Sequence, residues 1–204
     1  MVNKLAVFEL GVNDIKLTIY KHTPTGFFAA ESQIVEPVKL TQDMERDGYI
    51  KPMRIQETIA VLKNFRKIVD GAKIENLICY AAPVIATARN QIAFLDEVYK
   101  TVSLYFKVLS TEEQISALHN AVMYSFSMTR GVIMQIGDYS TELIKFNRRV
   151  ITNSVSIPLG SVTLLDKVKD LSMAERLDKV VEIMTAEFKK HDWLYSLEDR
   201  KSVV

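Results

Sequence analysis

The sequence lacks most of the residues that covalent, zinc or membrane chemistry would need. Its 204 residues include one cysteine, Cys79, and three scattered histidines. An internal disulfide is therefore impossible, and no Cys/His pair has the spacing of zinc ligands. No apolar run approaches the roughly 18 residues that suggest a transmembrane helix, and the first apolar run is shorter than the core and cleavage site of a signal peptide. We expect a cytoplasmic protein with no membrane partner.

A large net charge is also absent. The chain has 26 basic and 25 acidic residues, a formal net charge of +1, so it has no overall field that would attract nucleic acid. Its 48% hydrophobic and 25% charged composition is that of a globular protein with a substantial core. We therefore expect no nucleic-acid partner, and any anion site must be local.

What the sequence does contain is an internal repeat. The apolar segments Val7–Gly11 and Ile133–Gly137 both end in glycine, and Leu17 recurs as Leu143. The offset is constant, since 137 − 11 and 143 − 17 both give 126. Each copy reads as a strand, a tight glycine turn and a second alternating strand. Because turn amides can bind an anion, the repeat predicts a phosphate clamp between two related lobes.

Strands alternate with amphipathic helices along the chain, which indicates an α/β fold. The first lobe, expected over 1–128, should contain strands at 4–10, 15–21, 27–35, 74–81 and 106–109, and helices at 52–71, 92–102 and from Ser110 to about 127. Ser110 and Glu113 have the spacing of a capping box. The polar stretch at 36–51 is interpreted as an exposed loop.

The second lobe, expected over 129–204, begins with the second copy of the repeat. Its strands are expected from 131, over 141–147 and over 149–156, and its helices from 161 onward and over 173–188. Only a few residues remain beyond 194, and 202–204 read as the start of an unfinished strand. We therefore expect the second lobe to be truncated.

The order of these motifs resembles the Ppx/GppA family, the exopolyphosphatases and guanosine pentaphosphate phosphohydrolases of the actin-like ATPase superfamily. The resemblance rests on two phosphate loops, at 11–13 and 135–143, on Asn90 with Phe94–Leu95, and on the segments 108–113 and 156–162. It implies an actin-like (ribonuclease H-like) two-lobed fold with mixed β-sheets flanked by helices, and commonly a homodimer. It also implies Mg²⁺ as cofactor and polyphosphate or guanosine penta/tetraphosphate as ligand.

The family's catalytic glutamate, which acts as base for the attacking water, falls on Gln114. An amide cannot accept that proton usefully near pH 7, and the missing base would remove roughly 10²–10⁴ in rate. The neighbouring Glu113 is the possible substitute. One step along a helix turns a side chain by about 100°, so Glu113 does not simply take the same place.

By the same resemblance, Glu9, Gln135 and Glu142 stand at metal-side positions, and the phosphate-binding positions are Gly11, Asn13, Gly137, Ser140 and Thr141. Other positions of the site are altered: two serines are Val12 and Asp14, two glycines are Asp138 and Tyr139, and an arginine is Ala86. Plainer alternatives stay open. The two glycines would only permit tight turns, the polar residues would cap them, and Glu142 would be a strand residue facing solvent.

Two function hypotheses remain. The first is a Mg²⁺-dependent hydrolase that releases terminal phosphate from polyphosphate or converts pppGpp to ppGpp. The second is a pseudoenzyme that binds the same ligands without turnover or serves in assembly. The substitutions at the base, metal and phosphate positions favour the second hypothesis.

Overall fold

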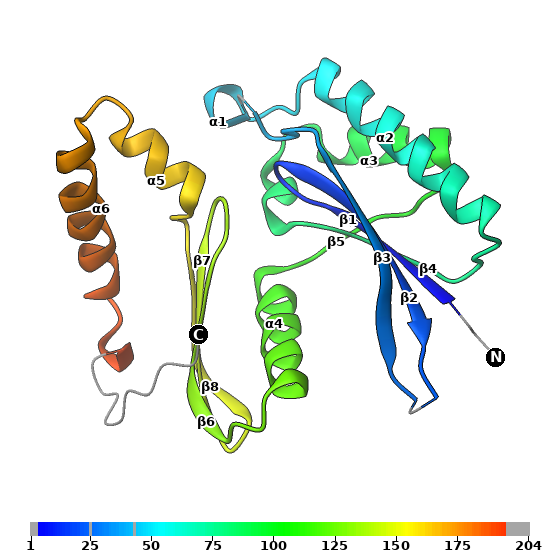
Figure 1. Ribbon diagram of the computed structural model, residues 1–204. Helices are drawn as coiled ribbons and strands as arrows, with labels where there is room; N and C mark the ends of the chain where they lie inside the picture. Colours follow the sequence, from blue (N-terminus) through cyan, green and yellow to red (C-terminus); the bar gives the residue numbers. More distant parts are fainter. Residues whose placement is uncertain (1–3, 25, 43, 195–204) are drawn as a thin grey trace. The chain divides into compact units, whose positions relative to one another are not determined.

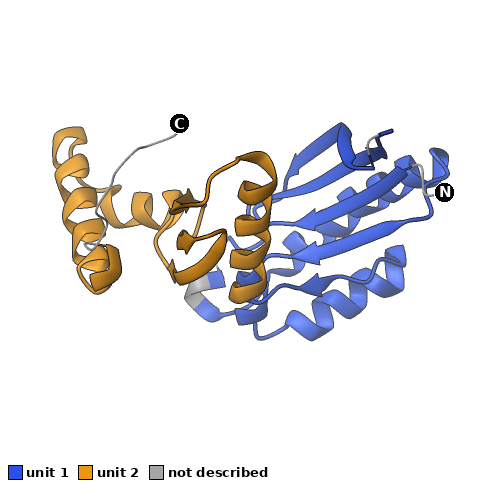
Figure 2. Cartoon of the chain, turned by 90° about the horizontal axis from the view of Figure 1, so that it is seen from below, with its two compact units in different colours: residues 1–110 blue, residues 111–204 orange. Residues whose placement is uncertain are grey.

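The computed structural model describes residues 4–24, 26–42 and 44–194 (Figure 1) and divides into two compact units, 1–110 and 111–204 (Figure 2). The boundary predicted from the sequence lies later, at 128/129. The difference is helix α4 (Thr111–Ser125), whose buried Ile115 and Met123 belong to a core cluster of the second unit. The unfinished strand predicted at 202–204 lies outside the described residues. None of the described helices is long and apolar enough to cross a membrane.

Unit 1 is built on a mixed five-stranded sheet in the order β3-β2-β1-β4-β5. The strands are β1 (Lys4–Leu10), β2 (Asp14–His22), β3 (Phe28–Pro37), β4 (Leu77–Ala81) and β5 (Lys107–Val108). The first three form the predicted antiparallel meander, while β4 pairs in parallel with β1 and with β5. The sheet therefore has one antiparallel half and one parallel half.

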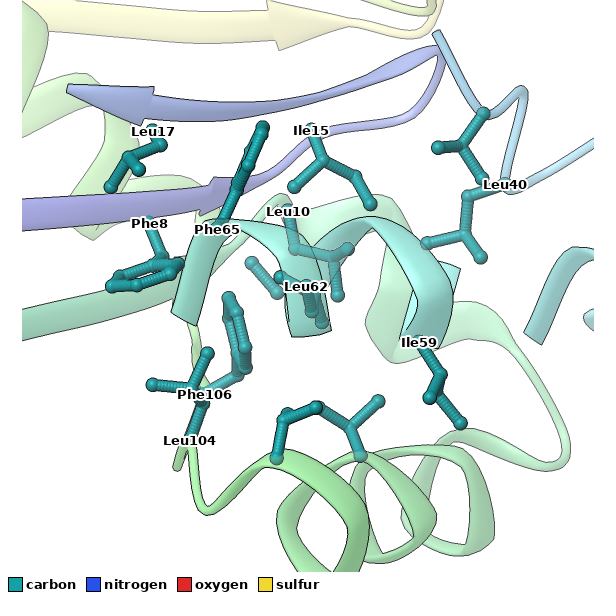
Figure 3. Packing of buried hydrophobic residues seen from close by; sticks show 14 of the residues in the cluster. Phe8, Leu10, Ile15, Leu17, Leu40, Ile59, Leu62, Phe65, Leu104 and Phe106 are labelled. Carbon is teal, nitrogen blue, oxygen red and sulfur yellow. The ribbon is translucent and has the colours of Figure 1, made fainter. Parts of the chain in front are cut away.

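The core of unit 1 lies between this sheet and helices α2 (Pro52–Gly71) and α3 (Gln91–Val102). Alternate residues of β1, including Phe8 and Leu10, are 0% exposed, as the period of two in a strand requires. Figure 3 shows them gathered with Leu62 and Phe65 of α2. Each fully buried side chain of this size contributes about 1.5–3 kcal/mol, so α2 is fixed firmly to the strands that carry the first turn.

The segment 36–51 is not the exposed loop that its polarity predicted. Val38, Leu40, Met44 and Ile50 are at most 7% exposed and belong to the unit 1 core, and 44–47 form the short helix α1 (Met44–Asp47). The apolar residues are spaced irregularly among polar ones, so the segment has no helical or strand periodicity from which their burial could be predicted. Their burial ties this segment to the end of the sheet where the first turn lies.

Unit 2 has a three-stranded antiparallel sheet covered on both faces. Its strands are β6 (Arg130–Ile136), β7 (Thr141–Asn147) and β8 (Val150–Ile157), in the order β6-β7-β8. Adjacent residues of β7 enter different cores: Ile144 packs with α4, and Leu143 packs with residues of α5 (Ser161–Val168) and α6 (Met173–Phe188). Successive strand residues point to opposite faces, so α4 covers one face and α5 and α6 cover the other.

Two short 3₁₀ helices complete the described chain. The first, η1 (Pro83–Thr87), connects β4 to α3, and the second, η2 (Asp192–Leu194), follows α6. Helix α6 begins with a capping box in which Ser172 accepts from the Glu175 amide and Glu175 accepts from the Ser172 amide. These hydrogen bonds lower the pKa of the Glu175 carboxyl.

Candidate functional site

The two predicted turns have the same backbone hydrogen bond. The Gly11 N–H donates to the Asp14 carbonyl at 3.0 Å, and the Gly137 N–H donates to the Ser140 carbonyl at 2.8 Å. A Cβ on Gly11 would lie 2.7 Å from the Asp14 carbonyl oxygen, whereas a Cβ on Gly137 would lie 3.2 Å from that of Ser140. Glycine is therefore required sterically in the first turn, and each glycine has a structural role whether or not its turn binds an anion.

The repeat extends beyond the turns into an irregularity of the strands. The pairing of β2 with β3 shifts register between Ile19 and Tyr20, and the pairing of β7 with β8 shifts between Lys145 and Phe146. Both shifts follow the same offset of 126 residues. A β-bulge is a specific local feature rather than a general property of strands, so its repetition supports a common architecture for the two hairpins.

The metal-side position Glu9 lies in a small polar network beside the first turn. Its Oε2 accepts a hydrogen bond from the Tyr80 hydroxyl at 2.9 Å, and its Oε1 lies 3.8 Å from Nζ of Lys16. Lys16 Nζ is also 3.5 Å from Oδ1 of Asp14. Burial, and then the neighbouring Glu9 carboxylate, raises the pKa of Tyr80 well above its usual range, which keeps its hydroxyl protonated as a donor.

The backbone of Asn13 anchors the first turn to the buried segment that follows β3. Its carbonyl accepts hydrogen bonds from the Val38 amide at 2.9 Å and from the Lys39 amide at 3.0 Å. Residue 39 adopts a positive φ of 49° at this point, a conformation that most side chains avoid. Asn13 therefore fixes the path of the chain after β3, in addition to the phosphate-side role that the sequence predicts for it.

Glu142, at a metal-side position, is buried in unit 2. The alternative interpretation, that it is a strand residue facing solvent, is therefore wrong. Glu142 is 2% exposed. Its Oε1 accepts hydrogen bonds from the hydroxyl of Ser140 at 2.6 Å and from that of Ser156 at 3.0 Å. Neighbouring Thr141 is 0% exposed and donates its hydroxyl to the Leu159 carbonyl at 2.6 Å. These hydrogen bonds satisfy a buried carboxylate that would otherwise be costly.

Helix α5 closes directly onto the second turn. The amides of Ser161 and Val162 donate to the carbonyls of Gly137 and Asp138, each at 2.9 Å. A Cβ on Gly160 would lie only 2.4 Å from the Asp138 carbonyl carbon, so this approach needs glycine. Ser161 Oγ also donates to Oδ1 of Asp138 at 3.3 Å. The first amides of α5 are thus occupied by the turn, which restricts where an anion could enter.

The catalytic position Gln114 lies in the first turn of α4, in unit 2, and its side chain is half-buried. Glu113, the possible substitute, precedes it and is also half-buried. Helix α4 starts at Thr111, directly after the predicted N-cap Ser110. An uncharged amide at Gln114 can donate and accept hydrogen bonds but cannot serve as a general base.

The residues near the family's arginine position connect η1 and α3 to the segment 48–50 in unit 1. Ala86 is exposed on η1. Arg89 lies beside Gly48, with Cζ 5.7 Å from the centroid of the Tyr49 ring. The Asn90 side chain accepts from the Ile50 amide and donates to the Ile50 carbonyl, both at 2.9 Å. Asn90 therefore joins α3 to the segment before α2.

Neither unit, as far as it is described, contains a cluster of side chains that would hold a metal ion by itself. Mg²⁺ takes oxygen ligands in octahedral geometry and is commonly held by carboxylates. Across residues 4–24, 26–42 and 44–194, no three His, Cys, Asp or Glu side chains group in a way that could hold a metal. Glu9 and Glu142 are engaged by Tyr80, Ser140 and Ser156, and Gln135 is uncharged and exposed.

Sequence reasoning missed three side chains that define these sites: Tyr80, Lys16 and Ser156. The contact of Lys16 could have been predicted from the sequence, because the hairpin about Gly11 places Lys16 directly opposite Glu9. Tyr80 reaches Glu9 through the parallel pairing of β4 with β1, which no local pattern indicates. Ser156 lies opposite Glu142 in the antiparallel pair of β7 and β8. The register of that hairpin could therefore have indicated this contact.

The sequence matches the Ppx/GppA phosphatase family over residues 18–203. The chain belongs to this family. A bifunctional 3-dehydroquinate synthase/phosphatase of Fusobacterium nucleatum is 28% identical over 171 residues, which cover 79% of this chain and 26% of that protein. A guanosine-5'-triphosphate,3'-diphosphate pyrophosphatase of Vibrio cholerae is 24% identical over 166 residues, 79% of this chain and 33% of that protein.

The solved structure of the Aquifex aeolicus Ppx/GppA family member is similar, with a TM-score of 0.78 and 25% identity. The structural match covers 92% of this chain and 62% of the Aquifex aeolicus chain. The predicted actin-like α/β fold, with sheets flanked by helices, is therefore confirmed. The family is one of exopolyphosphatase- and guanosine-pentaphosphate-type phosphohydrolases. This chain spans under two thirds of the length of each of these relatives.

Proposed function

We propose that this chain is a Ppx/GppA-family protein that binds polyphosphate or guanosine penta/tetraphosphate and that hydrolyses it poorly or not at all. The observation that carries the proposal is Gln114 in the first turn of α4. Both glycine turns keep the same hydrogen bond, so the scaffold of the loops is retained while the proton acceptor is replaced by an amide. Loss of a general base costs roughly 10²–10⁴ in rate.

The charges beside the first turn give further support. Glu9 and Asp14 both lie near Lys16, so this cation is shared by two carboxylates before any phosphate arrives. In addition, Ala86 provides no cation at the family's arginine position, and a charge-assisted hydrogen bond from such a cation contributes about 1.5–3 kcal/mol. Binding in this account depends on Lys16 and on turn amides other than those of the glycines.

The second candidate is an active exopolyphosphatase that releases terminal phosphate from polyphosphate or pppGpp with Mg²⁺. Membership of a phosphohydrolase family favours it. In this alternative Glu113 would take the role of base, Glu142 that of a metal-side carboxylate and Ser140 and Thr141 those of phosphate-binding residues. Both candidates are proposed as cytoplasmic proteins on the composition of the chain, and as homodimers because the family resemblance implies a dimer.

Calorimetric titration with long-chain polyphosphate, with and without Mg²⁺, tests the binding half of the proposal. Wild-type protein should bind, and Lys16→Gln should bind at least about tenfold more weakly, because Glu9 and Asp14 then lack their cation and repel the ligand. Lys21→Gln is the matched control, since Lys21 is an exposed lysine on the same strand. Failure of the folded wild-type protein to bind, or equal loss in both variants, would refute this proposal.

A further inference from the structure

Four basic residues gather at one end of the unit 2 sheet, at the end away from the second turn. Arg148 and Arg149 form the turn between β7 and β8. In the pairing of β6 with β7, Arg130 lies opposite position 147, two residues from Lys145. Arg130 and Lys145 are therefore diagonal neighbours on one face of the sheet. We call these four residues the basic end.

The segments that form the basic end contain no acidic residue. Residues 114–137 include β6 and most of α4, and residues 143–165 include β8 and most of β7. Neither segment contains an aspartate or a glutamate, and their only lysines and arginines are the four of the basic end. The whole chain has a formal net charge of only +1. The positive charge is thus concentrated locally, where it attracts anions.

The turn between β7 and β8 has a backbone conformation that arginine rarely adopts. Arg148 and Arg149 have φ angles of 51° and 62°, whereas a two-residue hairpin turn with positive φ at both positions favours Asn-Gly. Most residues avoid this region because the Cβ comes too close to the following carbonyl oxygen. Such outliers are concentrated at functional sites, so each arginine here calls for a physical reason.

For Arg149 the reason is structural. Its Nη1 donates to the carbonyl of Phe126 at 3.2 Å and to that of Met128 at 3.4 Å. Its Nη2 donates to the carbonyl of Met123, in the last turn of α4. The last carbonyls of a helix have no partner within it, and a cation at this end is favourable. Arg149 therefore caps α4 and holds it to the hairpin.

For Arg148 the described residues provide no such reason. Arg148 is exposed, and among these residues its side chain makes no hydrogen bond, ion pair or ring contact. Asparagine would form the same turn with less strain. The strained conformation therefore presents an unpaired guanidinium at the tip of the sheet, where it contributes no contact to the fold of the unit.

The basic end and the second turn lie at opposite ends of β7 (Thr141–Asn147). The strand has six residue steps, since 147 − 141 is 6, and they span roughly 20 Å at about 3.4 Å per residue. A triphosphate is much shorter than this span, whereas a long polyphosphate chain reaches from one end to the other. Only a long chain can therefore contact the turn and the basic end together.

We infer that the basic end is a second binding site for polyphosphate, which holds the part of a long chain beyond the second turn. The inference rests on the proposed function, in which this protein binds polyphosphate. Such a chain presents negative charge along its whole length, so cations alone can hold it. Nucleic acid fits less well, because single strands are bound by stacking on aromatic rings. The only aromatic ring in 130–134 and 143–155, that of Phe146, is 2% exposed.

Calorimetric titration of the whole protein with long-chain polyphosphate and with tripolyphosphate tests the inference through Arg148→Asn. The variant should bind the long chain at least about fivefold more weakly and tripolyphosphate within about twofold of the wild-type affinity. Its long-chain affinity should also depend less steeply on salt, because one fewer cation takes part in counterion release. Its thermal midpoint should be unchanged or higher, since asparagine adopts positive φ more readily.

Two control variants separate this site from general charge. Arg148→Lys keeps the charge, and Lys167→Gln removes an exposed lysine of α5, so both should bind the long chain within about twofold of wild type. Unchanged long-chain affinity in Arg148→Asn, an equal loss for tripolyphosphate, or an equal loss in Lys167→Gln would overturn the inference and leave the proposed function standing.

Failure of the folded wild-type protein to bind either polyphosphate would refute the proposed function together with the inference. Single-stranded RNA completes the comparison. Tighter binding of this RNA than of long-chain polyphosphate, weakened by Arg148→Asn, would assign the basic end to nucleic acid and overturn the inference.

Discussion

The Tyr80 hydroxyl donates to Oε2 of Glu9 at 2.9 Å, joining directly opposed residues of the parallel strands β4 and β1. Glu9 occupies a metal-side position by family resemblance, yet here its carboxylate is held by a neighbouring strand and by Lys16. The carboxylate therefore contributes to the stability of the first unit.

Tyr80→Phe should lower the free energy of unfolding by about 1 kcal/mol. A hydrogen bond to a charged group contributes about 1.5–3 kcal/mol when buried, and the one-third exposure of Glu9 reduces that figure. Urea denaturation measures the change. Tyr99→Phe is the matched control, because Tyr99 is 54% exposed on α3, and it should change stability by less than about 0.5 kcal/mol. Equal effects of the two variants would contradict the assigned contact.

Stability should fall at alkaline pH because of two neighbouring groups in β4. Burial raises the pKa of the Cys79 thiol from 9.0 to about 11 and raises that of Tyr80 above its usual 10.0. Both groups bind their protons more tightly in the folded state. The contribution of the Cys79 thiol is therefore complete below pH 9 and is lost as pH rises through 11, whereas that of Tyr80 begins to fall above its usual 10.0 and is lost at higher pH than that of the thiol. The thermal midpoint should fall over this range, and less steeply in Cys79→Ala. Parallel curves for the two proteins would count against a buried thiol.

Gly160→Ala should destabilise the protein severely, by about 3 kcal/mol or more. The new Cβ would lie 2.4–2.5 Å from backbone atoms of Gly137 and Asp138, and backbone cannot move aside as a flexible side chain can. Gly71→Ala is the control, since a Cβ there meets nothing within 4 Å, and it should be neutral or slightly stabilising. Thermal denaturation of both variants checks the difference. A mild effect at Gly160 would mean that α5 does not close on the second turn as described.

Glu142→Leu should cost about 2–3 kcal/mol, because the hydroxyls of Ser140 and Ser156 then lack their buried acceptor. Adding Ser140→Ala and Ser156→Ala should recover part of the loss, since removing both sides of a buried hydrogen bond is less costly than removing one. Urea denaturation of the single and triple variants measures the recovery. A triple variant less stable than Glu142→Leu would show that the hydroxyls have other partners.

The hairpins and the long helices were predictable from local pattern, and the contacts that define the site were not. Helix α6 and strand β7 have the predicted bounds because their apolar residues follow helical and strand periods. The burial of Glu142 depends on two helical layers that cover both faces of β7. Likewise, the ends of the segment between β3 and α2 are held by hydrogen bonds from Val38 to Asn13 and from Ile50 to Asn90. These partners are distant in sequence, so no local pattern indicates them.

Phosphate release from long-chain polyphosphate and from pppGpp, in the presence of Mg²⁺, tests the central claim most directly. It should be measured on the wild-type protein and on Gln114→Glu, both shown to be folded. The account predicts no release above background in either, because restoring the carboxylate at Gln114 leaves Ala86 and Gln135 at the family's cation and metal-side positions. Turnover by the wild-type protein, or by the single variant, would contradict the loss of catalysis and favour the active exopolyphosphatase.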